Sequence, residues 1–313
     1  VWSLAEANAY TAAGLWPTVG NVAAIGLFGG AANGTYSNVI ESIIIPSTGN
    51  STDFGDLTVS VQTLAACASS TRGIFGGGDT SSGDTNVIGY VTIAAAGNAT
   101  DFGDLTQARE ELASCSSASR GLFGGGLAGS TTVDVIDYIT IASTGDALDF
   151  GDLTTASRYL SACASTTRGI FGGERYSQNL ISYVTIASTG NATDFGDLTY
   201  GRYALASCSN NTRGLFGGGI NDSTFGLTNI IDYITIASTG NATDFGDLLS
   251  TVEEIAACSS DTRGVFAGGS GASLRVIQYV TIDTTGNATD FGDLQTDKKS
   301  HAGCSNAHGG IAA

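Results

Sequence analysis

The sequence predicts an all-β fold, a six-bladed β-propeller with four antiparallel strands in each blade. One phrase, Thr-Gly-Asn-Ala-Thr-Asp-Phe-Gly-Asp-Leu, recurs six times with small changes along the 313 residues. Its phenylalanines are Phe54, Phe102, Phe150, Phe195, Phe245 and Phe291, so the copies are spaced by 48, 48, 45, 50 and 46 residues. This period, combined with four short strand patterns per copy, is typical of propeller blades.

Each copy reads as four strands, which we name A to D in chain order. The polar or glycine-containing segments between them read as turns, and the third strand is rich in β-branched residues on both faces. A strand that is apolar on both faces belongs to a sheet covered on both sides. In the copy over residues 205–248, strands A to D are residues 205–209, 214–218, 229–236 and 243–248.

The order of the strands predicts how the ring closes. The chain enters the repeat at a B strand, residues 26–30, and the last A strand, residues 302–304, has only a short segment after it. We therefore expect this last strand to complete the first blade, which removes the open edges of the ring. The expected domains are an N-terminal arm or lead-in over residues 1–20 and the propeller over residues 21–313.

Composition excludes several classes of function. The formal net charge of −17 disfavours nucleic acid and anionic membranes as partners, because both require basic surfaces. No apolar run approaches the roughly 18 residues of a membrane span, and no signal-peptide pattern is visible. A lost leader stays open as an alternative, because the chain begins at Val1 and contains no Met.

The six cysteines occur once per repeat. Equivalent positions on neighbouring blades are about 10 Å apart, and a disulfide requires Cα atoms within about 7 Å. We therefore expect free, buried thiols, which fit assembly in a reducing cytoplasm. They are Cys67, Cys115, Cys163, Cys208, Cys258 and Cys304.

The repeated Asp-Phe-Gly-Asp turn resembles a metal loop only superficially. Two carboxylates three residues apart can offer oxygen ligands, but the denser spacing and closing Glu of strong calcium loops are missing. We favour a structural role in which Asp and Asn cap the turn and the phenylalanine packs between blades. No metal and no cofactor are expected.

A column of arginines follows each A–B turn except in the first repeat. The strand count places these side chains beside aspartates such as Asp53 and Asp56, so Asp–Arg contacts between blades are the expected role. An anion-binding crown is the alternative. The column is Arg72, Arg120, Arg168, Arg213 and Arg263.

The two ends of the predicted ring differ in character. The A–B and C–D turns share one end, the turn face, where the copies agree, and the B–C loops and D–A connections share the other, the loop face, where the copies differ. Charged and aromatic residues gather in the D–A connections and suit binding of a sugar or a peptide; unconstrained drift of loop tips is the alternative. The candidate ligand-binding residues are Arg109, Glu110, Arg158, Tyr159, Arg202, Tyr203, Glu253, Glu254, Lys298, Lys299 and His301.

Two family resemblances emerge from these motifs. The Gly-Gly that closes strand B, a tyrosine in strand C such as Tyr233, and an aromatic residue in strand D together resemble the kelch repeat over about 290 residues, with Phe here where kelch repeats usually carry Trp. The phrases Ile-Ala-Ser-Thr-Gly-Asn-Ala-Thr-Asp-Phe-Gly-Asp-Leu and Thr-Arg-Gly-Leu-Phe-Gly-Gly resemble repeats in tail-fibre and other virion proteins of aquatic bacteriophages.

These resemblances imply a non-enzymatic structural and binding module of a phage virion, a tail fibre or decoration protein assembled in the host cytoplasm. Its expected partners are other virion proteins and host surface glycan. An intracellular kelch-like adaptor with one protein partner is an alternative. A sugar-active enzyme is a third, although the adjacent pairs Glu110–Glu111 and Glu253–Glu254 point to opposite strand faces and form no ready dyad.

Overall fold

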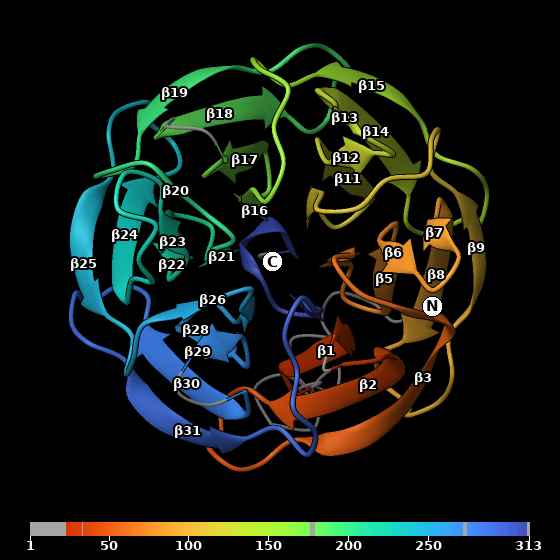
Figure 1. Ribbon diagram of the computed structural model, residues 1–313, viewed down its shortest axis with the longest axis horizontal. Helices are drawn as coiled ribbons and strands as arrows, with labels where there is room; N and C mark the ends of the chain where they lie inside the picture. Colours follow the sequence, from red (N-terminus) through yellow and green to blue (C-terminus); the bar gives the residue numbers. More distant parts are fainter. Residues whose placement is uncertain (1–22, 33, 176–178, 272–273, 312–313) are drawn as a thin grey trace, which may run out of the picture.

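The computed structural model describes residues 23–311 except 33, 176–178 and 272–273, and it is a six-bladed β-propeller (Figure 1). Six four-stranded antiparallel sheets surround a central axis, as the repeat predicts. The predicted N-terminal arm, residues 1–20, lies outside the described residues. Within the described part of the chain, no helix is long and apolar enough to cross a membrane.

In each blade, strand A lies nearest the axis, and strands B, C and D follow in order towards the outside. In the first three blades they are β32 (Ala302–Ser305), β1 (Ile25–Ala32), β2 (Tyr36–Ile44), β3 (Thr52–Val61); β4 (Ala65–Ala68), β5 (Arg72–Gly76), β8 (Val87–Thr92), β9 (Thr100–Asp104); and β10 (Ala113–Ser116), β11 (Arg120–Gly124), β14 (Val135–Thr140), β15 (Leu148–Asp152). In the last three they are β16 (Ser161–Ala164), β17 (Arg168–Gly172), β18 (Leu180–Thr185), β19 (Thr193–Asp197); β21 (Ala206–Ser209), β22 (Arg213–Gly217), β24 (Ile230–Thr235), β25 (Thr243–Asp247); and β27 (Ala256–Ser259), β28 (Arg263–Ala267), β30 (Val276–Thr281), β31 (Thr289–Asp293).

Four two-stranded sheets and one short 3₁₀ helix complete the described elements. The sheets pair β6 (Asp79–Thr80) with β7 (Gly83–Asp84), β12 (Leu127–Ala128) with β13 (Thr131–Thr132), β20 (Arg202–Tyr203) with β23 (Ile220–Asn221), and β26 (Val252–Glu253) with β29 (Ser270–Gly271). The helix is η1 (Gly309–Ile311).

The ring closes as the sequence predicts. Strand β32 is the inner strand of the first blade and pairs antiparallel with β1, with Gly26 opposite Ser305 and Leu27 opposite Cys304. Asn306 extends the pairing, since its Oδ1 accepts from the backbone N–H of Ile25 at 2.8 Å. The first and last strands of the propeller therefore lie in one sheet.

The apolar core is divided into six clusters, one at each interface between blades. Phe54 of the first blade packs with Phe75 and Val91 of the second, and the same arrangement recurs around the ring. In the second blade, the ring of Tyr90 meets Phe102 edge-on with centroids 5.9 Å apart, which is a favourable aromatic geometry. All six phenylalanines of the repeated phrase are buried.

The repeated phrase also joins neighbouring blades through the backbone. The N–H of Gly97, in the second blade, donates to the carbonyl of Phe54 at 2.7 Å, and Asn98 Oδ1 accepts from the N–H of Asp56 at 3.1 Å. Gly55 has φ +147°, and a Cβ there would overlap the carbonyl of Gly97. Glycine is therefore required at this close approach.

The six cysteines are free and buried, as predicted. Each thiol packs against a strand-B glycine of the next blade, as Cys67 does against Gly121. Burial raises the pKa of Cys67 and of Cys163 to about 12. These thiols therefore act as small apolar spacers between blades.

Candidate binding face

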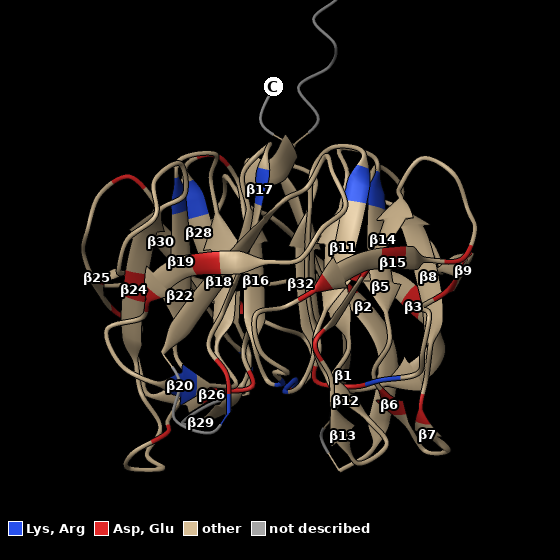
Figure 2. Ribbon diagram, turned by 90° about the horizontal axis from the view of Figure 1, so that it is seen from above, with Lys and Arg blue, Asp and Glu red and all other residues tan. Residues whose placement is uncertain are grey.

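The arginine column and the loops that differ between repeats lie at opposite ends of the ring. Figure 2 shows the arginine column near the upper end, on β11, β17 and β28, and the short strands of the loop face at the lower end, including β6, β12, β20 and β26. We describe the turn face first, because its arginines are not arranged as expected.

The arginine column joins blades through carbonyl groups, so the predicted carboxylate partners are wrong. The guanidinium of Arg72 lies 4.5 Å from the ring centroid of Tyr90, and its Nη1 donates to the carbonyl of Ile141 in the next blade at 2.8 Å. The same stack and the same bond occur at Arg120, Arg168, Arg213 and Arg263. The strand-C tyrosine holds the guanidinium flat, which aims it at the neighbouring carbonyl.

Three of the candidate ligand-binding residues are buried structural cations, so their prediction as ligand contacts is wrong. Arg109, Arg202 and Lys298 have no exposed side-chain area. They pair with buried carboxylates on strand C of the next blade along the chain, in the pairs Arg109–Asp137 at 2.9 Å, Arg202–Asp232 at 2.9 Å and Lys298–Glu41 at 3.8 Å.

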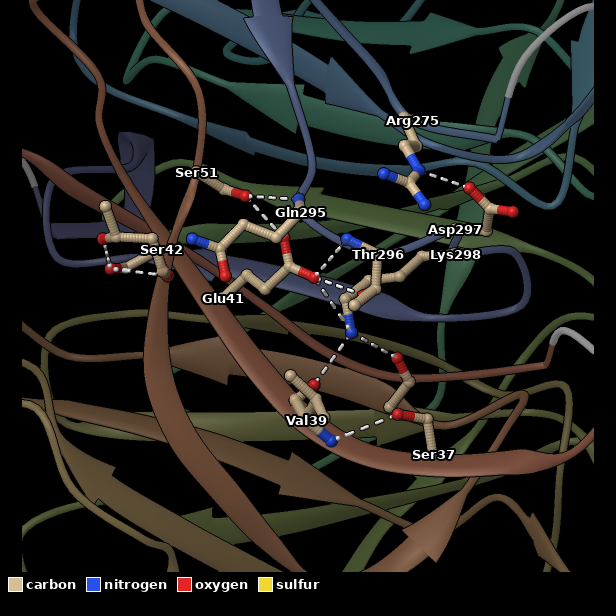
Figure 3. Close-up of polar contacts among 12 residues, drawn as sticks. Ser37, Val39, Glu41, Ser42, Ser51, Arg275, Gln295, Thr296, Asp297 and Lys298 are labelled. Carbon is tan, nitrogen blue, oxygen red and sulfur yellow. Dashed lines mark hydrogen bonds and ion pairs between the residues drawn. The ribbon is translucent and has the colours of Figure 1, made fainter.

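These buried pairs anchor every second D–A connection. In Figure 3, the carboxylate of Glu41 receives the backbone N–H groups of Gln295 and Thr296 as well as the ion pair with Lys298. Lys298 Nζ also donates to the carbonyl of Val39 at 2.9 Å. A buried charge is tolerated when its hydrogen-bonding capacity is filled in this way, so the role of these residues is to hold the connection.

His301 was also predicted to contact ligand. Its side chain is buried but lines the wall of the axial cavities, so this role stays a prediction. The centroids of the His301 and Phe28 rings are 6.0 Å apart. His301 stands at the position that Leu or Ile occupies in the other five blades. Within the described chain, neither ring nitrogen has a partner in hydrogen-bond geometry. The nearby carbonyl of Ala267 acts to raise the pKa of the ring. Burial and the charge of Lys298 lower the pKa of His301 to about 3, so the ring is neutral.

A closed ring of backbone hydrogen bonds surrounds the axis on the loop face. Six residues just before the A strands, which we name the mouth ring, are Thr63, Glu111, Tyr159, Ala204, Glu254 and Ser300. Each donates its N–H to the carbonyl of the previous member at 2.7 to 3.0 Å, and Thr63 donates to Ser300. All six have φ between +51° and +57°, a left-handed conformation that costs free energy in residues other than glycine.

The mouth ring brings two of the predicted residues, Tyr159 and Glu254, together at the axis. A cavity of about 80 Å³ opens there, lined by the mouth ring and by the residue that follows each member. A second axial cavity, of about 110 Å³, lies deeper in the channel between the inner strands. The sequence signal for the ring is the variable residue directly before the Leu, Ile or His that precedes strand A. The sequence-based selection of candidate residues missed the ring at Thr63, Glu111, Ala204 and Ser300.

Arginines and tyrosines form one side of this mouth. The rings of Tyr159 and Tyr203 lie 6.0 Å apart, with the Arg175 guanidinium 5.8 Å and 5.6 Å from their centroids. The Arg158 guanidinium is 5.7 Å from Tyr159 and its Nη1 lies 3.1 Å from Glu111 Oε2. Arg175 was not selected from the sequence, because it belongs to a B–C loop. Guanidinium groups therefore cover the tyrosine faces and present charged edges at the mouth.

Carboxylates dominate the other side. Glu110 accepts from the Thr63 hydroxyl at 2.9 Å, Glu253 is half-buried in β26, and Lys299 Nζ lies 3.3 Å from Glu254 Oε2. Burial raises the pKa of Glu110, Glu111 and Glu253 above the ordinary value, with the hydrogen bonds from Thr63 and Tyr159 opposing the shift at the first two. The predicted residues that remain partly accessible here are Glu110, Arg158, Tyr159, Glu253, Glu254 and Lys299.

One loop of this face carries a prominent exposed aromatic residue. Phe225 is 75% exposed and has φ +54°, between β23 and β24. The loop is fixed from within, because Asn221 Oδ1 accepts from the N–H groups of Ser223 and Thr224, and the Asn221 carbonyl accepts from the N–H of Phe225. Exposed aromatic side chains on rigid loops are typical anchors of protein interfaces.

The described residues contain no group of three or more His, Cys, Asp or Glu side chains placed to hold a metal ion. No protein-family model and no curated protein matches this chain. The fold is thus established by the structure, and the likeness to kelch and virion repeats depends on the sequence phrases alone.

Proposed function

We propose that this propeller is a non-enzymatic binding module that takes its ligand on the loop face, at the mouth ring and the B–C loops around it. The mouth ring is the observation that carries the proposal. Six equivalent backbone positions keep the same strained conformation and the same hydrogen bond, yet they carry six side chains, of five types, facing one cavity. Strained backbone at residues other than glycine is concentrated at functional sites.

We further propose that the module belongs to a phage virion, as a tail-fibre or decoration protein. The resemblance of the repeated phrases to virion repeats supports this role. Its partner is then host surface glycan or another virion protein. Phe225 supports the protein partner, because aromatic side chains are enriched in protein interfaces and often anchor them. An intracellular adaptor would use the same surface.

The location of the protein tests the virion role. Gold-labelled antibody against the propeller should decorate virus particles in electron micrographs, and labelling confined to the host cytoplasm would contradict it. Binding is then measured on a glycan array and by surface plasmon resonance against the purified structural proteins of the particle.

Variants of the mouth locate the binding surface. Tyr159→Ala combined with Arg175→Ala should weaken the interaction at least tenfold, and Ala204 shows that the mouth ring accepts alanine in this conformation. Thr144→Ala, an exposed turn-face residue, is the matched control. Unchanged affinity in the double variant, or a loss also in the control, would refute binding at the mouth. Glycan turnover that Glu254→Gln abolishes would favour the sugar-active enzyme instead.

A further inference from the structure

The inner strands are linked at the turn face by serine hydroxyl groups. Each hydroxyl donates to a carbonyl of the preceding inner strand at 2.5 to 2.8 Å, in the pairs Ser116–Ala68, Ser209–Ala164, Ser259–Ser209 and Ser305–Ser259. Two steps of this circle lack the hydroxyl, because the donor position holds Ala68 and Ala164. The carbonyls of Ser305 and Ser116 therefore receive no serine hydroxyl at this end of the channel.

Residues 306–311, which we name the axial segment, lie against the inner strands β10, β16 and β21 at the centre of the ring (Figure 1). The N–H of Gly310 donates to His308 Nδ1 at 3.1 Å, so the proton of the neutral ring is on Nε2. His308 Nε2 lies 3.0 Å from the carbonyl of Ala68 and 3.2 Å from Ser116 Oγ. The imidazole thus donates to the Ala68 carbonyl, which also accepts from the Ser116 hydroxyl.

Two buried glycines bring the backbone of the axial segment against the inner strands. A Cβ on Gly309 would overlap the carbonyl of Asn210, and a Cβ on Gly310 would overlap the carbonyl of Ser116. Neither glycine has positive φ, so the requirement is for space and not for conformation. The turn is closed by the N–H of Ile311, which donates to the carbonyl of His308 at 2.9 Å.

We propose that the turn-face end of the axial channel is a binding site for a His-Gly-Gly peptide segment, and that the axial segment of the same chain occupies it as a seal. The site recognises a neutral imidazole through Ala68 and Ser116, and it admits only glycine at the next two positions. This proposal concerns the end opposite the mouth ring and does not depend on the proposed function. With the seal in place, the axial cavities are open to ligand from the loop face only.

The protonation of His308 supports this arrangement. Burial lowers the pKa of His308 to about 4, and the Ala68 carbonyl opposes the shift. Protonation would place a hydrogen on Nδ1, which now accepts from Gly310, and would leave a charge in the channel. The neutral ring and the seated segment are therefore coupled.

The first test is a histidine titration by NMR on the full chain, which contains two histidines. His301→Leu assigns the signals, because Leu occupies that position in four other blades. We expect His308 to titrate near pH 4 in the parent protein and about two units higher in Gly310→Ala, whose side chain cannot be seated. Gly97→Ala, where a Cβ meets nothing within 4 Å, is the control and should leave the titration unchanged. A value near the ordinary pKa in the parent protein would overturn the proposal without any variant.

The second test supplies the segment in trans. The synthetic peptide Asn-Ala-His-Gly-Gly-Ile should bind the Gly310→Ala protein, and at least tenfold more weakly the parent protein, whose own segment competes at an effective concentration of the order of mM. The peptide with Ala at its second glycine should bind neither. Equal affinity for both proteins, or no binding to the variant at mM peptide, would overturn the binding site.

Discussion

The buried Arg202–Asp232 pair allows a sharp test of how the D–A connections are held. Both side chains are fully buried, and Arg202 donates to the carbonyls of Phe216, Gly218 and Ile230 besides Asp232. Removing one partner of such a pair leaves an uncompensated buried charge and costs about 3–5 kcal/mol. We therefore expect Asp232→Gln and Arg202→Val each to lower the free energy of unfolding by about that amount.

The sixth blade contains a natural replacement for the whole pair. There Val252 stands at the position of Arg202, and Gln278 stands at that of Asp232 and accepts from the N–H of Leu249 at 2.7 Å. The double variant Arg202→Val/Asp232→Gln should therefore recover at least half of the summed loss, since no charge is left unpaired. Guanidinium chloride unfolding followed by circular dichroism measures all four proteins. Losses that simply add in the double variant would refute the coupling.

Three further predictions follow from other contacts. A double-mutant cycle of Arg120→Ala and Tyr138→Ala should give a coupling free energy of about 1 kcal/mol by chemical unfolding, and a value near zero would mean that the stack only accompanies the carbonyl bond. Gly55→Ala should lower the melting temperature by several degrees, because its Cβ would overlap the backbone of the next blade, and an unchanged melting temperature would contradict that contact. Since the folded pKa values of His301 and His308 are about 3 and about 4, below the ordinary 6.5, the unfolded chain binds more protons and stability should fall as pH drops below about 6.5. His301→Leu should remove part of that slope in unfolding measured from pH 7 to pH 4, and an equal slope in both proteins would refute the assignment.

The architecture was predictable because each blade repeats the same local pattern. Strand count, closure by the last A strand and the separation of turn and loop faces all follow from the period and from glycine placement, as β32 in the first blade confirms. All six cysteines are free, as predicted, although the inner strands lie closer than the spacing used for that prediction, since Ser116 Oγ reaches the Ala68 carbonyl at 2.8 Å. The thiols pack against strand-B glycines of the next blade.

The environment of single charged residues was not predictable in this way. Arg109 looks like a loop residue, and its burial depends on Asp137, 28 residues later in the next blade. The signal is a difference between repeats that involves two positions at once. Where an Arg or Lys stands two residues before the mouth-ring position, the following strand C carries an acidic residue. Where that acidic residue is missing, the cation is replaced, by Val61, Ser157 and Val252. A second paired difference concerns the Arg–Tyr stack. In the first blade Ile25 stands at the arginine position and Ser42 at the tyrosine position, so both members are replaced together.

The closing ladder has a mechanical consequence. Because β1 and β32 are antiparallel, Ile25 and Asn306 lie at the same end of their four paired residues. A force that pulls Ile25 and Ile311 apart would first withdraw the axial segment and then peel the ladder one pair at a time, beginning with Gly26 and Ser305. Peeling loads a single hydrogen-bonded pair, whereas shear would load all four at once. Tension applied between the first and last strands of the propeller would therefore open the ring at low force.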